Sequence, residues 1–226
     1  MVPIKTAEIN RSNYGGRRTV QPQWIVMHYT ANDGDSDESN VRYFQDNIVK
    51  ASAHYFVDDD SITRTVPDDY VAYHCGANTY FHPSCRNYNS IGIELCDAKR
   101  DGTVMATPTT VENAAQLVAQ LCRQYKIPVD HIIRHYDVTH KMCPAYWVKD
   151  PRGFAAFKAR VDAILEEETE MIEQSYIIVN GAKKPVRRIL KDGQNFLNLR
   201  DLVKAMAGAA DFDVSSQGSI PVLTQE

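Results

Sequence analysis

The stretch SIGIELCD, residues 90–97, sets the expected fold class of this chain. Apolar residues and glycine run through it almost without interruption, which is typical of a β-strand that is covered on both faces of a sheet. The one charged residue within the apolar run is Glu94. A carboxylate in a buried strand is costly unless it has a task. The stretch therefore predicts an internal strand that carries a functional acid.

Outward from this strand, strand and helix patterns alternate along the chain. Residues 109–126 show apolar positions at helical intervals, with Thr109 and Glu112 at capping-box spacing and Pro128 beyond the end. A last helix is expected to open with Asp150 as its N-cap and Pro151 in the first turn. Further strands are expected at 24–28, at 131–135 and as a pair around the acidic turn within 52–66, and a short helix at 41–48. The alternation predicts an α/β domain over residues 1–165.

The composition changes after residue 165. Residues 166–175 are rich in charge and are expected to form a solvated helix end or a linker. Beyond them, Asn180-Gly181 is a strong hairpin signal, followed by a second turn, a short helix and a closing strand near 219–223. Residues 176–226 therefore predict a small α+β unit, near the lower size limit for independent folding. The expected function of this unit is binding to the cell wall or dimerisation of the chain.

Bulk composition excludes several classes of protein. The net charge of −4 argues against general nucleic-acid binding, and no apolar run is long enough to cross a membrane. The N-terminus lacks the apolar core of a signal peptide, and five cysteines without such a signal indicate free thiols, Cys75 and Cys85 included. The expected location is the cytoplasm.

A second informative stretch is RHYDVTHKMCP, residues 134–144. Its spacing fits no structural zinc site, so a metal would need a ligand from elsewhere in the chain. His28, at the end of the strand at 24–28, is the candidate, together with His135 and Cys143. Two imidazoles and a thiolate that leave a fourth position open are typical of catalytic zinc. Each residue also has a plainer interpretation, since a single histidine or cysteine is most often structural.

Four motifs occur in a definite order: HYTAN at 28–32, SAHYFVD at 52–58, NSIGIEL at 89–95 and HYDVTHKMCP at 135–144. Together they resemble the zinc-dependent N-acetylmuramoyl-L-alanine amidases of the amidase-2 type, which include phage endolysins and bacterial autolysins and are related to peptidoglycan-recognition proteins. The resemblance covers roughly residues 20–160. It implies a central mixed β-sheet flanked by helices, with Zn²⁺ at the floor of a substrate groove. It also implies hydrolysis of the amide bond between N-acetylmuramic acid and L-alanine in peptidoglycan.

Carried over residue by residue, the resemblance makes His28, His135 and Cys143 the metal ligands. Glu94 matches the catalytic carboxylate, and Lys141 matches the lysine near the scissile carbonyl. Two further matches, His74 and Asn89, imply substrate contacts, although both could equally hold loops together. Asp137 is expected either to orient a ligand or to cap a turn. His140 has no assigned role beyond its loop.

One departure from the pattern concerns Ala53. Some phage members of the family have a tyrosine at this position, directly before the histidine that corresponds to His54. The role of that tyrosine cannot be transferred, so Glu94 is expected to carry more of the proton transfer. His54 itself is expected to be a strand residue.

Two alternatives remain open from the sequence. A cysteine peptidase with Cys143 as nucleophile and His135 as base would leave His28 without a function. A recognition module that binds peptidoglycan without cutting it would typically lack the cysteine ligand, which this chain has. The favoured interpretation is a phage or prophage endolysin that stays in the host cytoplasm until lysis, with a possible homodimer through the C-terminal unit.

Overall fold

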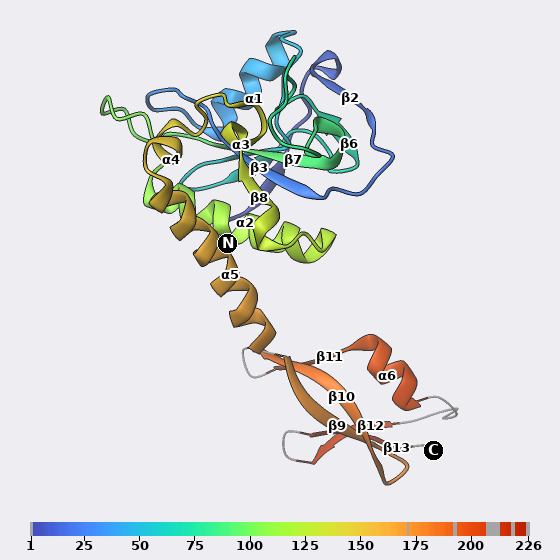
Figure 1. Ribbon diagram of the computed structural model, residues 1–226. Helices are drawn as coiled ribbons and strands as arrows, with labels where there is room; N and C mark the ends of the chain where they lie inside the picture. The colour runs from blue at the N-terminus through green and yellow to red at the C-terminus, as the bar shows by residue number, and fades with distance from the viewer. Residues whose placement is uncertain (1, 171, 192–193, 207–212, 218–219, 225–226) are drawn as a thin grey trace. The chain divides into compact units, whose positions relative to one another are not determined.

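The structure is a computed structural model that describes residues 2–170, 172–191, 194–206, 213–217 and 220–224. The chain divides into two compact units, Met1–Leu165 and Glu166–Glu226 (Figure 1). None of the helices in the described part of the chain combines the length and the apolar character that a membrane crossing requires.

A six-stranded mixed sheet forms the centre of the first unit, in the order β1-β5-β4-β7-β3-β8. Four of its five neighbour pairings register three residues each, and the pairing of β3 with β7, which registers six, is the longest. Strand β7 runs parallel to both of its neighbours, β3 and β4, whereas β4 and β5 form an antiparallel hairpin. The strands are β1 (Ile4–Thr6), β3 (Trp24–Tyr29), β4 (Tyr55–Val57), β5 (Ile62–Arg64), β7 (Ser90–Leu95) and β8 (Ile132–Arg134). This arrangement confirms the expected mixed sheet and each expected strand within it.

Two long helices cover one face of this sheet, α2 (Pro108–Tyr125) and α5 (Pro151–Glu170) (Figure 1). Their apolar side chains pack with alternate residues of the strands, including Ile25 and Met27 of β3 and Ile91 and Ile93 of β7, into the main core. Burial of such side chains stabilises a fold by roughly 1.5–3 kcal/mol each, before conformational entropy is subtracted. The main core therefore holds the odd-numbered residues of both central strands.

The predicted ends of helix α2 need two corrections. Its N-cap is Thr107, whose side chain accepts a hydrogen bond from the backbone N–H of Thr110, rather than Thr109. Glu112 takes no part in a capping box and instead forms an ion pair with Arg160 of α5, with a closest distance of 2.9 Å. The helix ends before Pro128, because Lys126 adopts a left-handed conformation at its C-terminus.

The opposite face of the sheet is covered by shorter elements. These include α1 (Asp37–Asp46) and α3 (His135–Thr139), together with the chain segment 73–89. Helix α1 begins earlier than expected, within the polar stretch that looked like a loop, because Ser36 and Ser39 form a capping box there. His135 opens helix α3 instead of ending a strand, and a further short helix that the sequence did not reveal, α4 (Ala145–Lys149), follows Cys143.

Several smaller elements complete the first unit. Strands β2 (Tyr14–Arg17) and β6 (Tyr70–Ala72) form a separate antiparallel pair. Short 3₁₀ helices lie at Arg11–Asn13, Asn87–Asn89 and Val129–His131. Asp150 accepts a hydrogen bond from the backbone N–H of Arg152 at the start of α5, as an N-cap residue would.

The described residues of the second unit form a five-stranded sheet in the order β11-β10-β9-β13-β12, together with helix α6 (Leu199–Met206). The expected hairpin is confirmed: β9 (Ile172–Val179) and β10 (Ala182–Lys191) are joined by Asn180-Gly181, both with positive φ. The other strands are β11 (Gln194–Leu197), β12 (Asp213–Gln217) and β13 (Ile220–Thr224). The expected second turn, at residues 192–193, lies outside the described residues.

The described residues of the charged stretch at 166–175 belong to the end of a helix and the start of a strand. Helix α5 continues to Glu170, and β9 begins at Ile172. The interpretation as a helix end therefore holds for residues 166–170.

Candidate functional site

The alternation of side chains along the central strands places the candidate residues on the face of the sheet opposite the long helices. His28 of β3 and Glu94 of β7 are register partners, and Phe56 of β4 is the partner of Glu94 on its other side. Because successive strand residues point to opposite faces, these even-numbered side chains point away from the main core. They also lie near the carboxyl ends of parallel strands, where open α/β sheets place their ligands.

The three predicted metal ligands come together, although they lie far apart in the sequence. One potential ligand atom from each of His28, His135 and Cys143 lies within 4.8 Å of the other two, and all three residues are buried. The Sγ atom of Cys143 is 3.8 Å from Nδ1 of His28, and the rings of His28 and His135 have centroids 4.5 Å apart. The order of strands brings β8, and with it the start of α3, beside β3.

The chemistry of this donor set fits a metal ion. Nδ1 of His135 is buried without a hydrogen-bond partner, as a nitrogen that serves as a metal ligand would be. Burial lowers the pKa of His28 well below its usual value and that of His135 to about 4, so both imidazoles are neutral and can donate a lone pair. Burial also raises the pKa of the Cys143 thiol to about 12. A thiolate in this position therefore needs a cation beside it.

Glu94 lies beside these ligands and lines a cavity of about 600 Å³ with Lys141 and Cys143. Burial raises the pKa of the Glu94 carboxyl to about 7, while the Lys141 ammonium acts in the opposite direction. Oε2 of Glu94 is buried and has no hydrogen-bond partner. A carboxyl group with a pKa near neutrality can both take up and release a proton during a reaction.

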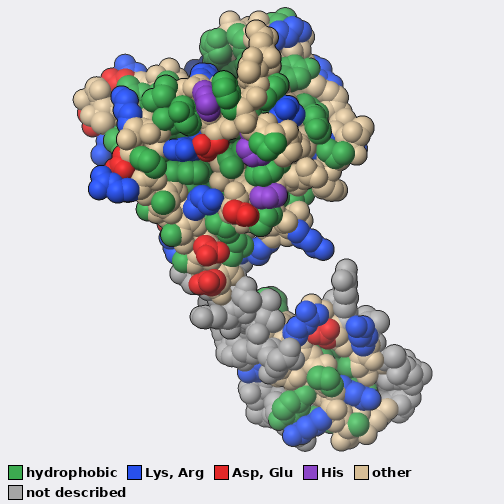
Figure 2. All heavy atoms as spheres, in the orientation of Figure 1, with side chains coloured by type: hydrophobic (Ala, Val, Ile, Leu, Met, Phe, Trp, Pro, Cys, Tyr) green, Lys and Arg blue, Asp and Glu red, His purple; other side chains and the backbone are tan. Residues whose placement is uncertain are grey.

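The cavity is an open groove with a mixed lining. Polar groups of Asn32 and Ser39 line it together with the aromatic rings of Tyr29 and Tyr43. Tyr43 and Met142 are about half exposed, at 52% and 49%, and give the rim an apolar surface. On the visible face of the first unit, acidic, basic and histidine side chains likewise lie among hydrophobic side chains (Figure 2).

The loop that carries Lys141 is held at both ends. The backbone N–H of Tyr136 donates to the carbonyl of Cys143 at 3.0 Å, and that of Cys143 donates to the carbonyl of Lys141 at 2.7 Å. His140, in a left-handed conformation, stacks on the ring of Phe81 with centroids 3.6 Å apart. His140 thus packs against the neighbouring segment, which gives it a structural role next to Lys141.

Asp137 caps the start of helix α3, which is close to one of its two expected roles, capping a turn. Its carboxylate accepts a hydrogen bond from the backbone N–H of Arg134 at 2.8 Å and forms an ion pair with the same residue's guanidinium at 2.7 Å. Arg134 in turn donates to the carbonyl of Trp147 in α4. These bonds fix the start of α3, where His135 lies.

His74 and Asn89 are both buried, and their side chains are engaged within the protein. Nδ1 of His74 is 3.1 Å from Nε2 of His28, and its Nε2 is 3.0 Å from Oγ of Ser90. The Asn89 side chain accepts a hydrogen bond from the backbone of Arg86 and donates to Gln23 and to the carbonyl of Ser84. A substrate contact by either residue stays a prediction, and the bonds seen here are those of residues that hold the site and its loop.

Ser90, at the start of β7, also lies near the site and is not among the residues predicted from the sequence. Its signal was weak, because a serine at the start of a strand is common. His54, expected in a strand, lies instead in a bend directly before β4; it is fully buried, and its ring Nδ1 accepts a hydrogen bond from the backbone N–H of Gly92. All five cysteines have free thiols, Cys75 and Cys85 included.

A second group of acidic residues, Asp37, Glu38 and Asp58, also comes together. Its members have structural partners: Ser61 and Thr63 donate to Asp37, and Lys5 forms an ion pair with Glu38. This group therefore organises the start of α1.

The first unit is thus a mixed α/β domain with a candidate metal centre beside a carboxyl group in a groove. The sequence profile of the amidase-2 family, the N-acetylmuramoyl-L-alanine amidases, matches residues 18–146, which is more than half of the chain. The chain therefore belongs to this family.

Individual relatives agree with this assignment. A probable N-acetylmuramoyl-L-alanine amidase of Bacillus licheniformis is 34% identical over 221 residues, covering 94% of this chain and 60% of the relative. Among solved structures, the catalytic domain of XlyA shares 26% identity with a TM-score of 0.60, covering 71% of this chain and 99% of that domain. A mutant endolysin from Bacillus subtilis gives the same values. The chain thus spans about 60% of the length of the curated relative that it matches.

Proposed function

We propose that this chain is a zinc-dependent N-acetylmuramoyl-L-alanine amidase, which hydrolyses the lactyl amide bond between N-acetylmuramic acid and L-alanine in bacterial peptidoglycan. The observation that carries the proposal is the convergence of His28, His135 and Cys143 beside Glu94 in a groove. Membership of the amidase family supports the choice of substrate.

His28, His135 and Cys143 would hold the zinc ion. Zinc bound by three protein ligands acts as a Lewis acid and lowers the pKa of water toward about 7, which supplies a nucleophile for amide hydrolysis at neutral pH. Two neutral nitrogens and one thiolate would leave a bound zinc ion with a net positive charge, which would favour a developing oxyanion nearby.

Glu94 is proposed to move the proton. Its carboxylate takes a proton from the attacking water and then donates it to the amine of the departing L-alanine, which would otherwise leave as an unstable anion. A pKa of about 7 lets the same group do both steps near neutral pH. Its unpartnered Oε2 is free of competing bonds within the protein.

Lys141 is proposed to stabilise the negative charge that builds on the former carbonyl oxygen. Its side chain is exposed and lines the same cavity as Glu94. The packing of His140 on Phe81 restrains the loop, so the ammonium group has a limited region to occupy.

Burial of Cys143 and His135 disfavours Cys143 as a nucleophile. A nucleophilic cysteine needs a lowered pKa, whereas burial raises the pKa of Cys143 to about 12. The proposed base of that alternative, His135, has a pKa of about 4 and would accept a proton poorly. A binding module without activity would have no need of Glu94 and its raised pKa.

The test combines metal analysis with product analysis. Purified full-length protein is expected to contain one zinc ion per chain and to release stem peptides with a free L-alanine amino group, together with intact glycan chains, as identified by mass spectrometry. Cleavage within the glycan or between amino acids of the peptide would contradict the proposal.

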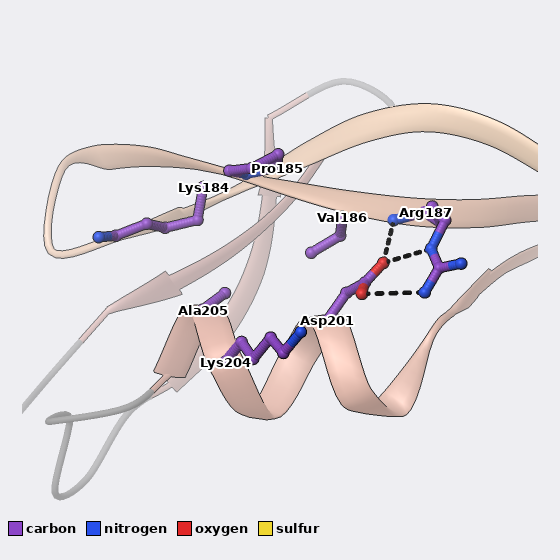
Figure 3. A pocket seen from close by; sticks show the side chains of 7 residues that line it. All are labelled: Lys184, Pro185, Val186, Arg187, Asp201, Lys204 and Ala205. Atoms are coloured by element: carbon purple, nitrogen blue, oxygen red, sulfur yellow. Dashed lines mark hydrogen bonds and ion pairs between the residues drawn. The ribbon is translucent and has the colours of Figure 1, made fainter.

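We further propose that the second unit binds an anionic polymer of the cell wall. A pocket of about 400 Å³ lies between β10 and α6 and is lined by Lys184, Arg187, Asp201 and Lys204 (Figure 3). Asp201 accepts two hydrogen bonds from the Arg187 guanidinium, at 2.8 and 3.2 Å. One carboxylate thus stands among three cations, which leaves the pocket positively charged.

The wider surface of the second unit agrees with this proposal. Figure 2 shows Lys and Arg side chains on the described part of its visible face, with acidic atoms between some of them. Dimerisation through this unit is the alternative, because its described core is small and consists of Ile177, Val179 and Val186 with a few partly buried neighbours.

A role as a phage or prophage endolysin, which would act on the wall after release from the host cytoplasm, is supported by the similarity to the Bacillus subtilis endolysin.

A further inference from the structure

A chain of hydrogen bonds runs from the candidate metal site into the protein. Nε2 of His28 is 3.1 Å from Nδ1 of His74, and Nε2 of His74 is 3.0 Å from Oγ of Ser90. The Ser90 hydroxyl donates to the backbone carbonyl of Arg86 at 2.7 Å. His28, His74 and Ser90 are at most 9% exposed, so water does not replace these bonds.

The last bond of this chain determines the direction of all the others. A serine hydroxyl has one proton, and at Ser90 this proton is given to the Arg86 carbonyl. Oγ of Ser90 must then accept from Nε2–H of His74, which leaves Nδ1 of His74 as an acceptor. Nδ1 of His74 in turn accepts from Nε2–H of His28. In this arrangement the other nitrogen of His28, Nδ1, carries no proton.

We propose that His74 and Ser90 are positioning residues, which hold the proton of His28 on Nε2 and so keep Nδ1 free to bind the metal. Nδ1 is the nitrogen of His28 that lies 3.8 Å from Sγ of Cys143. This inference rests on the proposed zinc site and explains how its first ligand is prepared. It also gives His74 a task other than contact with the substrate.

The reverse arrangement of protons would block the site. If Ser90 donated to His74, then Nδ1–H of His74 would donate to Nε2 of His28, and the proton of His28 would sit on Nδ1. That nitrogen could then not bind a cation. The carbonyl of Arg86, which can only accept, therefore selects the arrangement that suits the metal.

The position of His74 is fixed by packing as well as by hydrogen bonds. A Cβ atom added to Gly92 would lie 2.4 Å from Cγ of His74, so only glycine at this point of β7 leaves room for the ring. The ring of His54 stands edge-on to His74, with centroids 5.7 Å apart. The backbone N–H of His74 also donates to the side chain of Asn87. These contacts hold the imidazole ring of His74 next to His28.

The test measures zinc affinity of the full-length protein by competition with a chromophoric chelator. His74→Leu and Ser90→Ala are each expected to weaken zinc binding by about 10–100-fold, the usual effect of losing such a partner of a metal ligand. Thr65→Val is the matched control, since it removes another buried hydroxyl that donates to a carbonyl, that of Ala53 at 2.7 Å. The control is expected to keep the affinity of the wild type.

A double variant separates positioning from a general effect on folding. If Ser90 acts through His74, then Ser90→Ala is expected to cause no further loss of affinity in the His74→Leu background. The pair Ser90→Thr and Ser90→Val provides a second measurement, because the two side chains have the same shape and differ in the hydroxyl. Ser90→Thr is expected to bind zinc about 10–100-fold more tightly than Ser90→Val. The absorption spectrum of bound Co²⁺ is expected to change in the weakened variants and not in the control.

Three results would overturn the inference. One is a Ser90→Ala variant with the affinity of the wild type, and another is equal loss from Ser90→Ala with and without His74. The third is equal affinity of the Ser90→Thr and Ser90→Val variants. A wild-type chain that binds no zinc would overturn the proposed function as well, so failure of the function and failure of this inference alone are distinguishable.

Discussion

His28 and Glu94 are register partners on the parallel strands β3 and β7. Partners in a parallel pair project from the same face of a sheet, so the first metal ligand and the proposed proton carrier are placed side by side by backbone pairing alone. The other two ligands arrive from the segment after β8, the strand on the far side of β3. The central strands thus provide a rigid base for His28 and Glu94, whereas Lys141 and Cys143 lie on the loop between α3 and α4.

Glu94→Gln is expected to abolish turnover while zinc stays bound. Glutamine has nearly the same shape but cannot take up a proton from water, and loss of a general acid–base group lowers rates by about 10²–10⁴-fold. Release of peptides from purified peptidoglycan and zinc content, both measured on the same preparation, check this. Glu112→Gln is the matched control, because Glu112 lies on helix α2 and pairs with Arg160. Normal turnover by Glu94→Gln with full zinc would place the proton transfer elsewhere.

Cys143→Ser is expected to lose zinc and activity together. A serine hydroxyl is a much weaker zinc ligand than a thiolate at neutral pH. Cys122→Ser changes another buried cysteine, in helix α2, and is expected to keep its zinc. Elemental analysis of both variants checks the ligand set. Chelation followed by readdition of zinc should abolish and restore wild-type activity, whereas activity that survives chelation would favour the cysteine nucleophile.

The raised pKa of Glu94 predicts a pH-dependent stability in the zinc-free protein. The folded state holds this proton up to about pH 7, whereas the ordinary value is 4.5. Stability from this group is therefore fully present below pH 4.5 and is lost as the pH rises to about 7. Compared with the wild type, Glu94→Gln is expected to gain up to about 3 kcal/mol in free energy of unfolding at pH 8 relative to pH 4. Urea unfolding of both zinc-free proteins at the two pH values measures this, and a constant difference would contradict it.

Lys141→Ala is expected to lower kcat while zinc affinity stays near that of the wild type. The loss is expected to reach at most about 10²–10³-fold, the effect of removing one donor to an oxyanion. Lys141→Arg keeps the positive charge and should restore part of the rate. Lys126→Ala removes an exposed lysine at the end of α2 and serves as the control. Unchanged kcat in Lys141→Ala would show that this lysine only lines the groove.

Much of this architecture could be predicted from local sequence patterns. The strands around His28 and Glu94 have continuous apolar character, and the helix at 108–125 has a clear period, so their existence follows from short-range signals. The ends of a helix are harder to predict, because several neighbouring residues can each serve as its N-cap. Thr107 and Thr109 both stand before the same apolar stripe, and the folded chain uses Thr107, which accepts from the backbone N–H of Thr110, while Glu112 pairs with Arg160.

The role of His74 could not be predicted in the same way. Its sequence context, AYHCG, contains nothing that points to His28 or to Ser90. The hydrogen bonds that join these residues depend on the sheet register and on the space left by Gly92, which are properties of the folded chain. The start of α3 at His135 is similar, since Asp137 and Arg134 stabilise it by contacts that a strand-like sequence does not reveal.

The last prediction concerns the second unit. The double variant Lys184→Glu/Lys204→Glu reverses both lysines of the pocket between β10 and α6 and is expected to weaken lysis of intact walls while cleavage of soluble muramyl peptides stays unchanged. The reason is that a second contact with the wall raises the effective concentration of the enzyme near its substrate, and an anionic polymer would be repelled by the new charges. Reversal of two exposed lysines of the first unit, Lys126→Glu/Lys149→Glu, is the matched control for net charge. The difference between double variant and wild type should shrink as salt rises, because charges at an exposed surface are screened within about 10 Å at 0.1 M ionic strength. Equal lysis of walls by the two proteins would remove wall binding from this pocket. A halved molecular mass of the double variant in light scattering would assign the unit to dimerisation instead.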